Sequence, residues 1–261
     1  MIDQPEANPR QPNQEQPTVN VLCIKWGTKY GSDYVNRLYR MVSRHLSRPF
    51  RFVCLTDEPH DIDSAIETRP IPKIGFAPFD QRDPWVFQHG WLKLTCLAAP
   101  LHDVVGKTLF LDLDIVIVDS LDPFFDRSSP FTVIKEWDKK DGTGNTSVFL
   151  FEAGAHADAL DYLRDGYPAV IKRVRNEQEF MTGFIRDQGK LGYWPDEWCR
   201  SFKRHCMQSG LSSWFKAPEI PAGARIIIFH GKPNPPDAIR GISGKWYRRV
   251  LPTPWVDLHW R

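Results

Sequence analysis

The sequence predicts an α/β fold with one mixed, mostly parallel central sheet flanked by helices. Short apolar runs alternate with amphipathic segments from residue 20 onward, which is typical of parallel βαβ units. The 261 residues are 41% hydrophobic, enough to bury one sizeable core. The apolar run TLFLDLD at 108–114 closes with two acids, as expected where a buried strand ends at a ligand site.

The domain organisation follows from composition. Residues 1–18 are rich in Pro, Gln and Asn and lack the apolar core of a secretory signal, so we interpret them as a disordered tail on a cytoplasmic protein. We expect a single domain over 19–261. No run approaches about 20 apolar residues, so no transmembrane helix is expected.

The amino-terminal half predicts strands and helices in alternation. Tyr34, Leu38 and Met41 recur at helical spacing, with Ser32 or Asp33 placed to cap that helix. A second helix is expected around Leu92 to Leu101. The expected strands are residues 21–24, 50–55, 66–71 and 108–113.

The carboxyl-terminal half is less regular. A charged, glycine-containing turn at 138–144 separates two expected strands, and two helical stretches follow. The Pro-rich end from about residue 231 should be irregular. The expected strands are 131–137, 147–151 and 224–229, and the expected helices are 156–164 and 176–186.

The acids Asp112 and Asp114 are the strongest functional signal. Spacing i, i+2 places them on one side of an extended strand, where both can reach one hard cation. An unpaired carboxylate at the end of a core strand is costly, and a divalent metal is an economical partner. A salt-bridged structural pair is the alternative. The pattern favours an enzyme that handles a phosphate-bearing substrate through a metal.

A second candidate ligand follows the last apolar run. His230 is succeeded at once by Gly231 and Lys232. Imidazole is an acceptable Mn²⁺ ligand, glycine permits close backbone approach, and lysine supplies a charge for phosphate. A histidine after a strand can equally be structural, and the two acids are what favour the ligand interpretation.

Charge is distributed unevenly along the chain. Residues 199–261 contain 11 Lys and Arg against 3 Asp and Glu, whereas the preceding residues contain 23 against 29. The basic segment fits either a surface that faces phosphates or anionic lipid, or an ordinary solvated face. No nucleic-acid-binding module is recognisable, so nucleic acid is not an expected partner. The oligomeric state stays open.

Several segments together resemble the GT-A fold glycosyltransferases, and glycosyltransferase family 8 in particular, which includes glycogenin and bacterial lipopolysaccharide galactosyltransferases. FLDLDIVIVDSLDPFF resembles the metal-binding DxD strand of that family, and LKLTCL resembles the helix whose lysine approaches the nucleotide. NTSVFLF resembles the strand that lines the donor-sugar site, NEQEFM the Asp-Gln motif, and HGKP the terminal metal and phosphate motif. The resemblance spans about residues 21–235.

The resemblance implies a metal-dependent glycosyltransferase (hexosyltransferase-like) with a nucleotide-sugar donor, most naturally a UDP-sugar, and a glycan or lipid-linked acceptor. Asp112, Asp114 and His230 would hold Mn²⁺ or Mg²⁺. Glu177 would bind donor-sugar hydroxyls, and Gln178 would stabilise positive charge near the anomeric carbon. The remaining candidate donor-binding residues are Lys25, Trp26, Thr28, Tyr30, Lys93, Leu113, Asn145, Ser147, Gly231 and Lys232.

Two alternatives stay open. A haloacid-dehalogenase-like phosphatase also has a hydrophobic strand followed by DxD and would use Asp112 as nucleophile, although such motifs usually open their domain. Departures from the family pattern permit a non-catalytic nucleotide-sugar-binding module, because Ser147 replaces the usual glycine, Glu177 replaces aspartate, and the histidine motif is compressed. Trp26 and Tyr30 could stack on a nucleobase or only close the end of the sheet.

Overall fold

The computed structural model describes residues 17–261 except 89, 209 and 246–247, together with all side chains of that range except those of 87 and 88. The predicted tail at 1–18 lies almost wholly outside the described residues. Among those residues, each helix is too short or too polar to cross a membrane.

The central sheet is mixed and mostly parallel, which confirms the predicted fold class. Its strand order is β3-β2-β1-β4-β7-β6-β8. Strand β7 runs antiparallel to both of its neighbours, and the other adjacent pairs are parallel. The strands are β1 (Val19–Lys25), β2 (Phe50–Thr56), β3 (Glu67–Arg69), β4 (Lys107–Leu111), β6 (Phe131–Lys135), β7 (Gly144–Glu152) and β8 (Leu191–Tyr193).

A second, three-stranded sheet joins distant parts of the chain. Its order is β5-β10-β9, formed by β5 (Ile115–Ile117), β10 (Ile226–Ile228) and β9 (Cys199–Ser201). The strand expected at 224–229 is therefore present as β10, although no local pattern indicated this separate sheet. Its pairing ties the segment after the two acids to the carboxyl-terminal part of the molecule.

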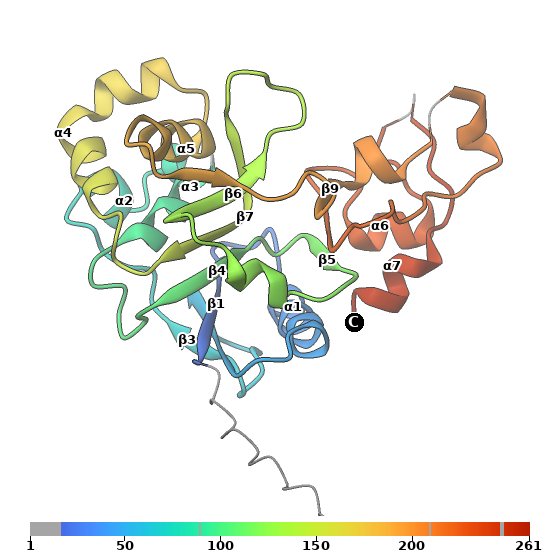
Figure 1. Cartoon of the computed structure of the whole chain (residues 1–261), viewed down its shortest axis with the longest axis horizontal. Helices are drawn as coiled ribbons and strands as arrows, with labels where there is room; N and C mark the ends of the chain where they lie inside the picture. The colour runs from blue at the N-terminus through green and yellow to red at the C-terminus, as the bar shows by residue number, and fades with distance from the viewer. Residues whose placement is uncertain (1–16, 89, 209, 246–247) are drawn as a thin grey trace, which may run out of the picture.

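Helices cover both faces of the central sheet (Figure 1). Helix α1 (Ser32–His45) packs on one face together with the small sheet. The other face carries α2 (Ala77–Asp80), α3 (Pro84–Gln88), the 3₁₀ helix η1 (Trp91–Leu97), α4 (Asp158–Arg173) and α5 (Glu177–Asp187). The remaining short helices are η2 (Asp122–Asp126), η3 (Phe202–Cys206), η4 (Gly210–Trp214), α6 (Pro235–Arg240) and α7 (Pro254–His259).

The inner strands of the central sheet are buried on both faces, whereas the edge strands β3 and β8 are only partly buried. Val21 and Cys23 of β1 belong to the core shared with α1, whereas Leu22 and Ile24 belong to the core shared with η1, α4 and α5. A strand covered on both faces has no polar face, so its sequence is a continuous apolar run instead of an alternating pattern. This burial explains why these runs predicted strands correctly.

Two local expectations were wrong. The N-cap of α1 is Gly31, and it makes no side-chain capping bond, so Ser32 and Asp33 lie in the first turn. The end of the chain contains helices α6 and α7, each of which begins with proline. Proline is compatible with the first turn of a helix because the amide it lacks has no intrahelical partner there.

Candidate functional site

The predicted acids lie at the carboxyl end of the central sheet, in a turn between β4 and β5. Strand β4 ends at Leu111, so Asp112 and Asp114 are not aligned by strand periodicity, and that detail of the prediction was wrong. The Asp112 amide donates to the Ser147 carbonyl of β7 at 2.9 Å, and the Phe229 amide donates to the Asp114 carbonyl at 3.0 Å. These bonds connect the turn to β7 and to the residue before His230.

Lys93 joins two of the acids. It lies on η1, and its ammonium group is 2.7 Å from the Asp112 carboxylate and 3.9 Å from that of Glu177. It also donates to the Thr146 carbonyl at 3.2 Å. Burial by itself lowers the pKa of an ammonium group, but the two carboxylates outweigh it and raise the pKa of Lys93. Lys93 is therefore charged at neutral pH and fixes the orientation of Asp112.

Asp114 has a hydroxyl partner instead of a cation in contact. The Tyr30 hydroxyl donates to its carboxylate at 2.6 Å. Burial, followed by repulsion from Asp112, raises the pKa of Asp114 to about 6. Burial and the neighbouring Asp114 also raise the pKa of Tyr30, so its phenol remains protonated. Two adjacent acids with this electrostatic repulsion form a site that a cation would stabilise.

Glu177 is mostly buried at the start of α5. Asn176 caps α5 by accepting from the Glu179 amide, and the Glu177 side chain is only 13% exposed. Burial raises its pKa, while Thr146 donates to its carboxylate at 3.4 Å. The helix start thus directs Glu177 inward, next to Lys93.

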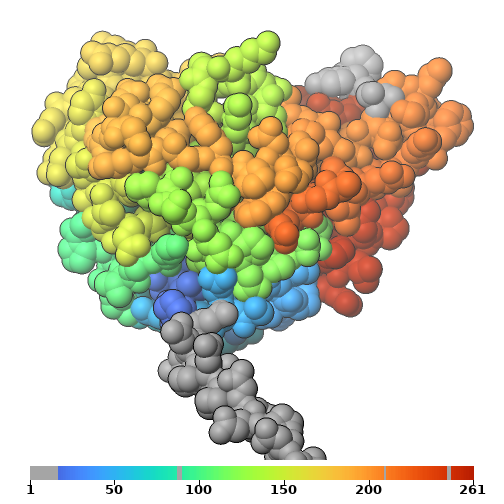
Figure 2. Space-filling model, in the orientation of Figure 1, coloured from blue at the N-terminus to red at the C-terminus, as the bar shows by residue number. Residues whose placement is uncertain are grey.

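A polar cavity of about 560 Å³ lies between the β6–β7 hairpin, the start of α5 and the segment after β10. Figures 1 and 2 show this hairpin, in green, standing out between α5 and the orange carboxyl-terminal part. Its lining includes Asn145, Gln178 and His230 together with Glu136 and Trp137. The structure thus gathers three predicted site residues around one cavity.

Glu136 orients two amide side chains of this cavity. Its carboxylate accepts from Asn145 Nδ2 and from Gln178 Nε2, each at 3.3 Å. The Asn145 Oδ1 atom accepts from the Ser147 amide at 3.0 Å. Since the amide nitrogen of Gln178 is committed to Glu136, its carbonyl oxygen is the end available to a substrate.

His230 lies on the opposite wall of the cavity. Its Nε2 atom is 2.7 Å from the Ser201 hydroxyl, and its ring stacks on Trp137 at 5.9 Å between centroids. Burial, then the nearby Lys203 and Arg204, lower the pKa of His230 to about 4. The imidazole is therefore neutral at physiological pH, which is the state that can bind a metal.

The structure does not bring every candidate to the acids. Lys232 is exposed and pairs with Asp237 at 2.9 Å, and Lys25 is buried and pairs with Glu58 at 3.3 Å. Leu113 is buried in the core. Trp26 is half-buried and Thr28 is exposed in the loop after β1. Their contacts with a donor remain predictions.

The predicted metal ligands do not form a closed set. Within the described part of the chain, no three His, Cys, Asp or Glu side chains are grouped closely enough to hold an ion together.

The turn at 231 has a positive φ of 68°, a conformation that favours glycine. Gly231 is therefore required for the backbone path that follows His230.

Sequence reasoning missed Glu136, Trp137 and Ser201. The first two residues follow β6 and were predicted only as the end of the strand at 131–137. Their position in the sequence could have indicated the site. They end the expected strand just before the one that carries Asn145, and two such neighbouring strands, here β6 and β7, commonly pair directly. Ser201 ends β9, whose pairing with β10 is long-range and leaves no local pattern.

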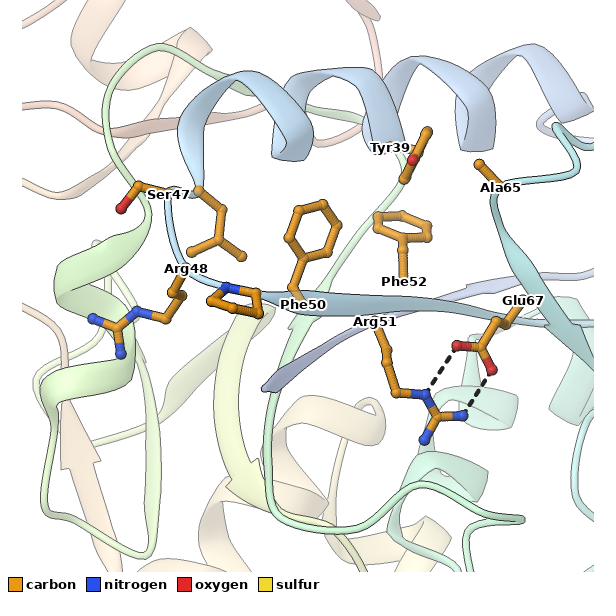
Figure 3. A pocket seen from close by; sticks show the side chains of 10 residues that line it. Tyr39, Ser47, Arg48, Phe50, Arg51, Phe52, Ala65 and Glu67 are labelled. Atoms are coloured by element: carbon orange, nitrogen blue, oxygen red, sulfur yellow. Dashed lines mark hydrogen bonds and ion pairs between the residues drawn. The ribbon is translucent and has the colours of Figure 1, made fainter. Parts of the chain in front are cut away.

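A second cavity, of about 500 Å³, lies at the opposite end of the sheet (Figure 3). Aromatic side chains Tyr39, Phe50 and Phe52 line it, and Arg51 and Glu67 pair at its rim. It lies near the amino ends of β2 and β3 and contains none of the predicted site residues. Ligands of open α/β sheets gather at the carboxyl ends of strands, so the cavity beside Gln178 is the candidate site.

Comparisons with known proteins support the fold. No family model matches the sequence, and a search of curated proteins returned no match. The structure is similar to that of the galactosyltransferase LgtC in complex with donor and acceptor sugar analogs, and to that of an active-site mutant of LgtC. In both cases the TM-score is 0.57 at 13% identity, covering 88% of this chain and 92% of LgtC.

The glycosyltransferase GlyE of Streptococcus pneumoniae TIGR4 is a further structural match. It aligns with a TM-score of 0.59 at 13% identity, covering 93% of this chain. This chain spans 60% of the length of GlyE. Together with the sheet order and its parallel βα units, these matches show that the chain has the GT-A-like fold of these glycosyltransferases.

Proposed function

We propose that this protein is a glycosyltransferase that moves a sugar from a nucleotide-diphosphate donor, with UDP-sugars as the first candidates, to a glycan or lipid-linked acceptor. One observation carries the proposal. In a GT-A-like fold, Asp112, Asp114 and the buried Lys93 lie at the carboxyl end of the sheet, next to the strand that supplies Asn145 to a polar cavity.

The side chains present match a divalent cation in ligand type. Carboxylate oxygens and a neutral imidazole are acceptable ligands for Mn²⁺, and positive charge would offset the burial and the repulsion from Asp112 that raise the pKa of Asp114. Asp112, Asp114 and His230 are not grouped around one point as they stand, so they would hold Mn²⁺ or Mg²⁺ only after their side chains move together around the ion. When bound, such an ion neutralises the diphosphate and makes it a better leaving group.

The chain's own residues would bind and orient the donor. Lys93 holds Asp112 in place, and Glu177 would accept hydrogen bonds from sugar hydroxyls. Gln178, fixed by Glu136, would direct its carbonyl dipole at positive charge developing on the sugar. An amide is no general base, so Gln178 would act through electrostatic stabilisation.

The loop after β1 would bind the nucleotide. Trp26, Thr28 and Tyr30 follow the strand that ends at Lys25, and Tyr30 already contacts Asp114. Ser147 lies on the strand that would line the sugar. Lys232 and Gly231 would reach the phosphates only after Lys232 leaves Asp237, which is a small movement for an exposed side chain.

A cytoplasmic location at the inner membrane face belongs to the same proposal. The five cysteines are unpaired and buried, as is usual in a reducing compartment. The phosphatase alternative gains no support. Strands β1, β2 and β3 of the central sheet precede Asp112, whereas the nucleophile motif of such phosphatases usually opens the domain. A non-catalytic nucleotide-sugar-binding module remains the competing proposal.

A thermal-shift screen of nucleotide sugars, with Mn²⁺ and with EDTA, tests donor binding. At about 100 times its dissociation constant, a ligand of the folded state adds about 2.7 kcal/mol of stability, which corresponds to roughly 5–10 °C for a chain of this size. We expect a UDP-sugar to raise the melting temperature in Mn²⁺ and to lose most of that effect in EDTA. Uridine monophosphate, which lacks the diphosphate, is the control.

Turnover separates the enzyme from the binding module. We expect the stabilising donor to be hydrolysed slowly and to release nucleoside diphosphate in Mn²⁺. Binding without hydrolysis, and without transfer to any glycan or lipid-linked acceptor, would favour the non-catalytic module. If no nucleotide sugar shifts the melting temperature, the proposal is wrong.

A further inference from the structure

A short segment after η3 exposes large apolar side chains. Leu211 and Phe215 are 82% and 83% exposed, and Trp214 is 55% exposed. All three lie within five residues, in or next to η4. Single exposed apolar residues are ordinary, whereas a group of this kind on a folded protein indicates contact with a partner or a membrane.

Positive side chains surround these apolar residues. The Arg249 guanidinium lies 4.2 Å from the centre of the Trp214 ring, and the exposed Lys216 follows Phe215 directly. Lys216 and Arg249 also line one small cavity, so the two segments lie side by side. Arg248 precedes Arg249 and acts electrostatically on Lys203 of η3, which extends the positive region toward the candidate site.

Acids do not balance this charge. Residues 199–261 contain three acids against eleven Lys and Arg. One of the acids, Asp237, is buried and already accepts from Lys232. The other two acids, Glu219 and Asp257, are exposed and offset only part of the positive charge. The segment around η4 therefore combines exposed apolar side chains with a surplus of positive charge, which is the composition of peptides and domains that lie on anionic bilayers.

The patch continues into the rim of the candidate site. In η3, Arg204 lines the cavity that contains His230, and Lys203 donates a hydrogen bond to the His230 carbonyl. Figures 1 and 2 show η3 and η4 in the orange part of the molecule, on the same side of the β6–β7 hairpin. A surface that docks at η4 would hold the cavity close to that surface.

We propose that Leu211, Trp214 and Phe215, together with Lys216, Arg248 and Arg249, form a docking patch for an anionic lipid bilayer. The apolar side chains enter the headgroup region, and the cations face lipid phosphates. The inference deepens the proposed function because it names the surface at which a lipid-linked acceptor would be met. Its binding test needs no donor, so the two proposals can fail separately.

Co-sedimentation with vesicles tests the docking patch. The full chain is mixed with vesicles of phosphatidylcholine, or of equal parts phosphatidylcholine and phosphatidylglycerol. We expect binding to the anionic vesicles, and weaker binding at high salt because the charges are screened. Leu211→Ser with Phe215→Ser, and separately Lys216→Glu with Arg249→Glu, should each weaken it at least about tenfold.

Matched controls use the same kinds of change elsewhere. Val105→Ser removes a side chain that is 76% exposed at the other end of the sheet, and Lys172→Glu with Arg173→Glu reverses two exposed charges at the end of α4. These variants should bind like the unmodified chain, and all variants should keep its melting temperature.

Two results would overturn the docking patch. The first is equal binding to both vesicle types, or no binding at all. The second is self-association, seen by light scattering without vesicles and lost in the Leu211→Ser and Phe215→Ser variant, which would assign the patch to a second copy of this chain. A donor-induced thermal shift that persists in either case would leave the proposed function standing.

Discussion

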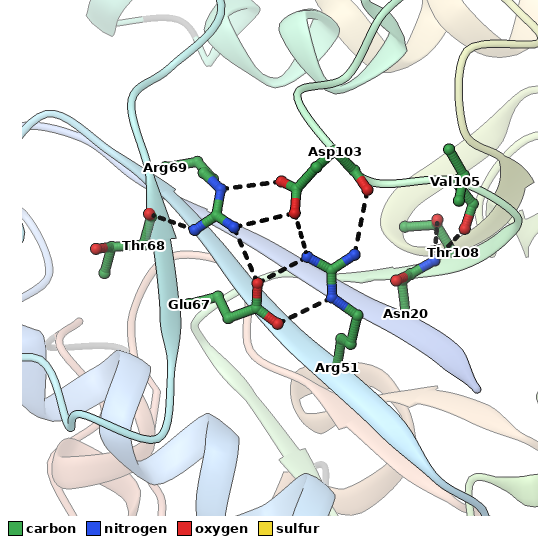
Figure 4. Close-up of polar contacts among 8 residues, drawn as sticks. All are labelled: Asn20, Arg51, Glu67, Thr68, Arg69, Asp103, Val105 and Thr108. Carbon is green, nitrogen blue, oxygen red and sulfur yellow. Dashed lines mark hydrogen bonds and ion pairs between the residues drawn. The ribbon is translucent and has the colours of Figure 1, made fainter.

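Charged side chains lie at both ends of the central sheet, but the pKa values of the acids are shifted in opposite directions at the two ends. At the amino ends of the strands, Arg51 and Arg69 pair with Glu67 and Asp103 in a connected network (Figure 4). A hydrogen bond from Arg51 lowers the pKa of Glu67, and hydrogen bonds from Arg69 and then Arg51 lower that of Asp103. Each of these acids is satisfied by the protein itself.

At the carboxyl ends of the strands, the acids outnumber the cations in contact with them. Asp112, Asp114 and Glu177 are brought near one buried contacting cation, Lys93. Burial raises the pKa values of Asp114 and Glu177. Acids that stabilise a fold have lowered pKa values, whereas acids held in an unfavourable environment are typical of functional sites. The comparison therefore separates a structural network from the candidate functional site.

The largest expected effect is on activity. Asp114→Asn should reduce donor hydrolysis or transfer about 1000-fold, because it removes a carboxylate from the proposed metal site. The melting temperature should stay the same or rise, since asparagine still accepts from Tyr30 and removes the repulsion with Asp112. Steady-state release of nucleoside diphosphate and a thermal melt measure both.

Asp103→Asn is the matched control at the other end of the sheet. It removes one carboxylate from the network of Arg51 and Arg69 and should leave turnover unchanged. Near-normal turnover of Asp114→Asn, or an equal loss in both variants, would remove the functional distinction between the two ends.

The next effect is on stability. Lys93→Met should destabilise the fold by about 3–5 kcal/mol, because breaking a buried ion pair from one side leaves charge without a partner. Asp112 and Glu177 are 22% and 13% exposed, so water compensates only in part. Urea unfolding followed by circular dichroism gives the free energy.

A triple variant sharpens this test. Adding Asp112→Asn and Glu177→Gln to Lys93→Met removes the unpaired charges and should recover much of the lost stability. If Lys93→Met is as stable as the unmodified chain, the ammonium group does not hold the two acids together.

A smaller effect is expected at the amino ends. Arg51→Met should cost about 1 kcal/mol, since its partners are about a third or more exposed and such pairs are screened by solvent. Turnover should not change. A loss as large as that of Lys93→Met, measured by the same urea titration, would show that the two charge clusters are energetically alike.

Much of this architecture could be predicted from the sequence because of burial. Strands covered on both faces must be apolar throughout, so β1, β2 and β4 were evident. Their carboxyl ends meet at one edge, which is why the loop after β1 and the two acids could be expected together, and Tyr30 of that loop contacts Asp114. The proximity of Lys93 to Asp112 was expected only from the family resemblance. Helical periodicity likewise gave α1 and α5.

The remaining features depend on contacts between distant residues. Strands β5 and β10 pair although about a hundred residues separate them, and no local pattern records such a partner. In the sequence, Glu136 is only a glutamate near the end of an expected strand. Its contacts with Asn145 and Gln178 exist only in the folded chain. Lys232 was assigned to phosphate by motif, yet its partner in the structure is Asp237 at the start of α6.

The smallest expected effect is the pH dependence of the amino-end network. Because the folded-state pKa of Glu67 is lowered, its stabilisation is present above the ordinary glutamate pKa of 4.5 and is lost as pH falls through the lower, folded value. The stability gap between the unmodified chain and Arg51→Met, about 1 kcal/mol near pH 6, should therefore shrink by pH 3 as the share of Glu67 is lost. The share of Asp103 should remain at pH 3, because its folded-state pKa is lowered further. Urea unfolding at each pH measures the gap, with Lys172→Met as a control for the loss of one exposed cation. A gap that stays constant through this window would mean that the pair with Glu67 does not stabilise the fold, and the contrast between satisfied and unsatisfied acids would then lose its support from Glu67.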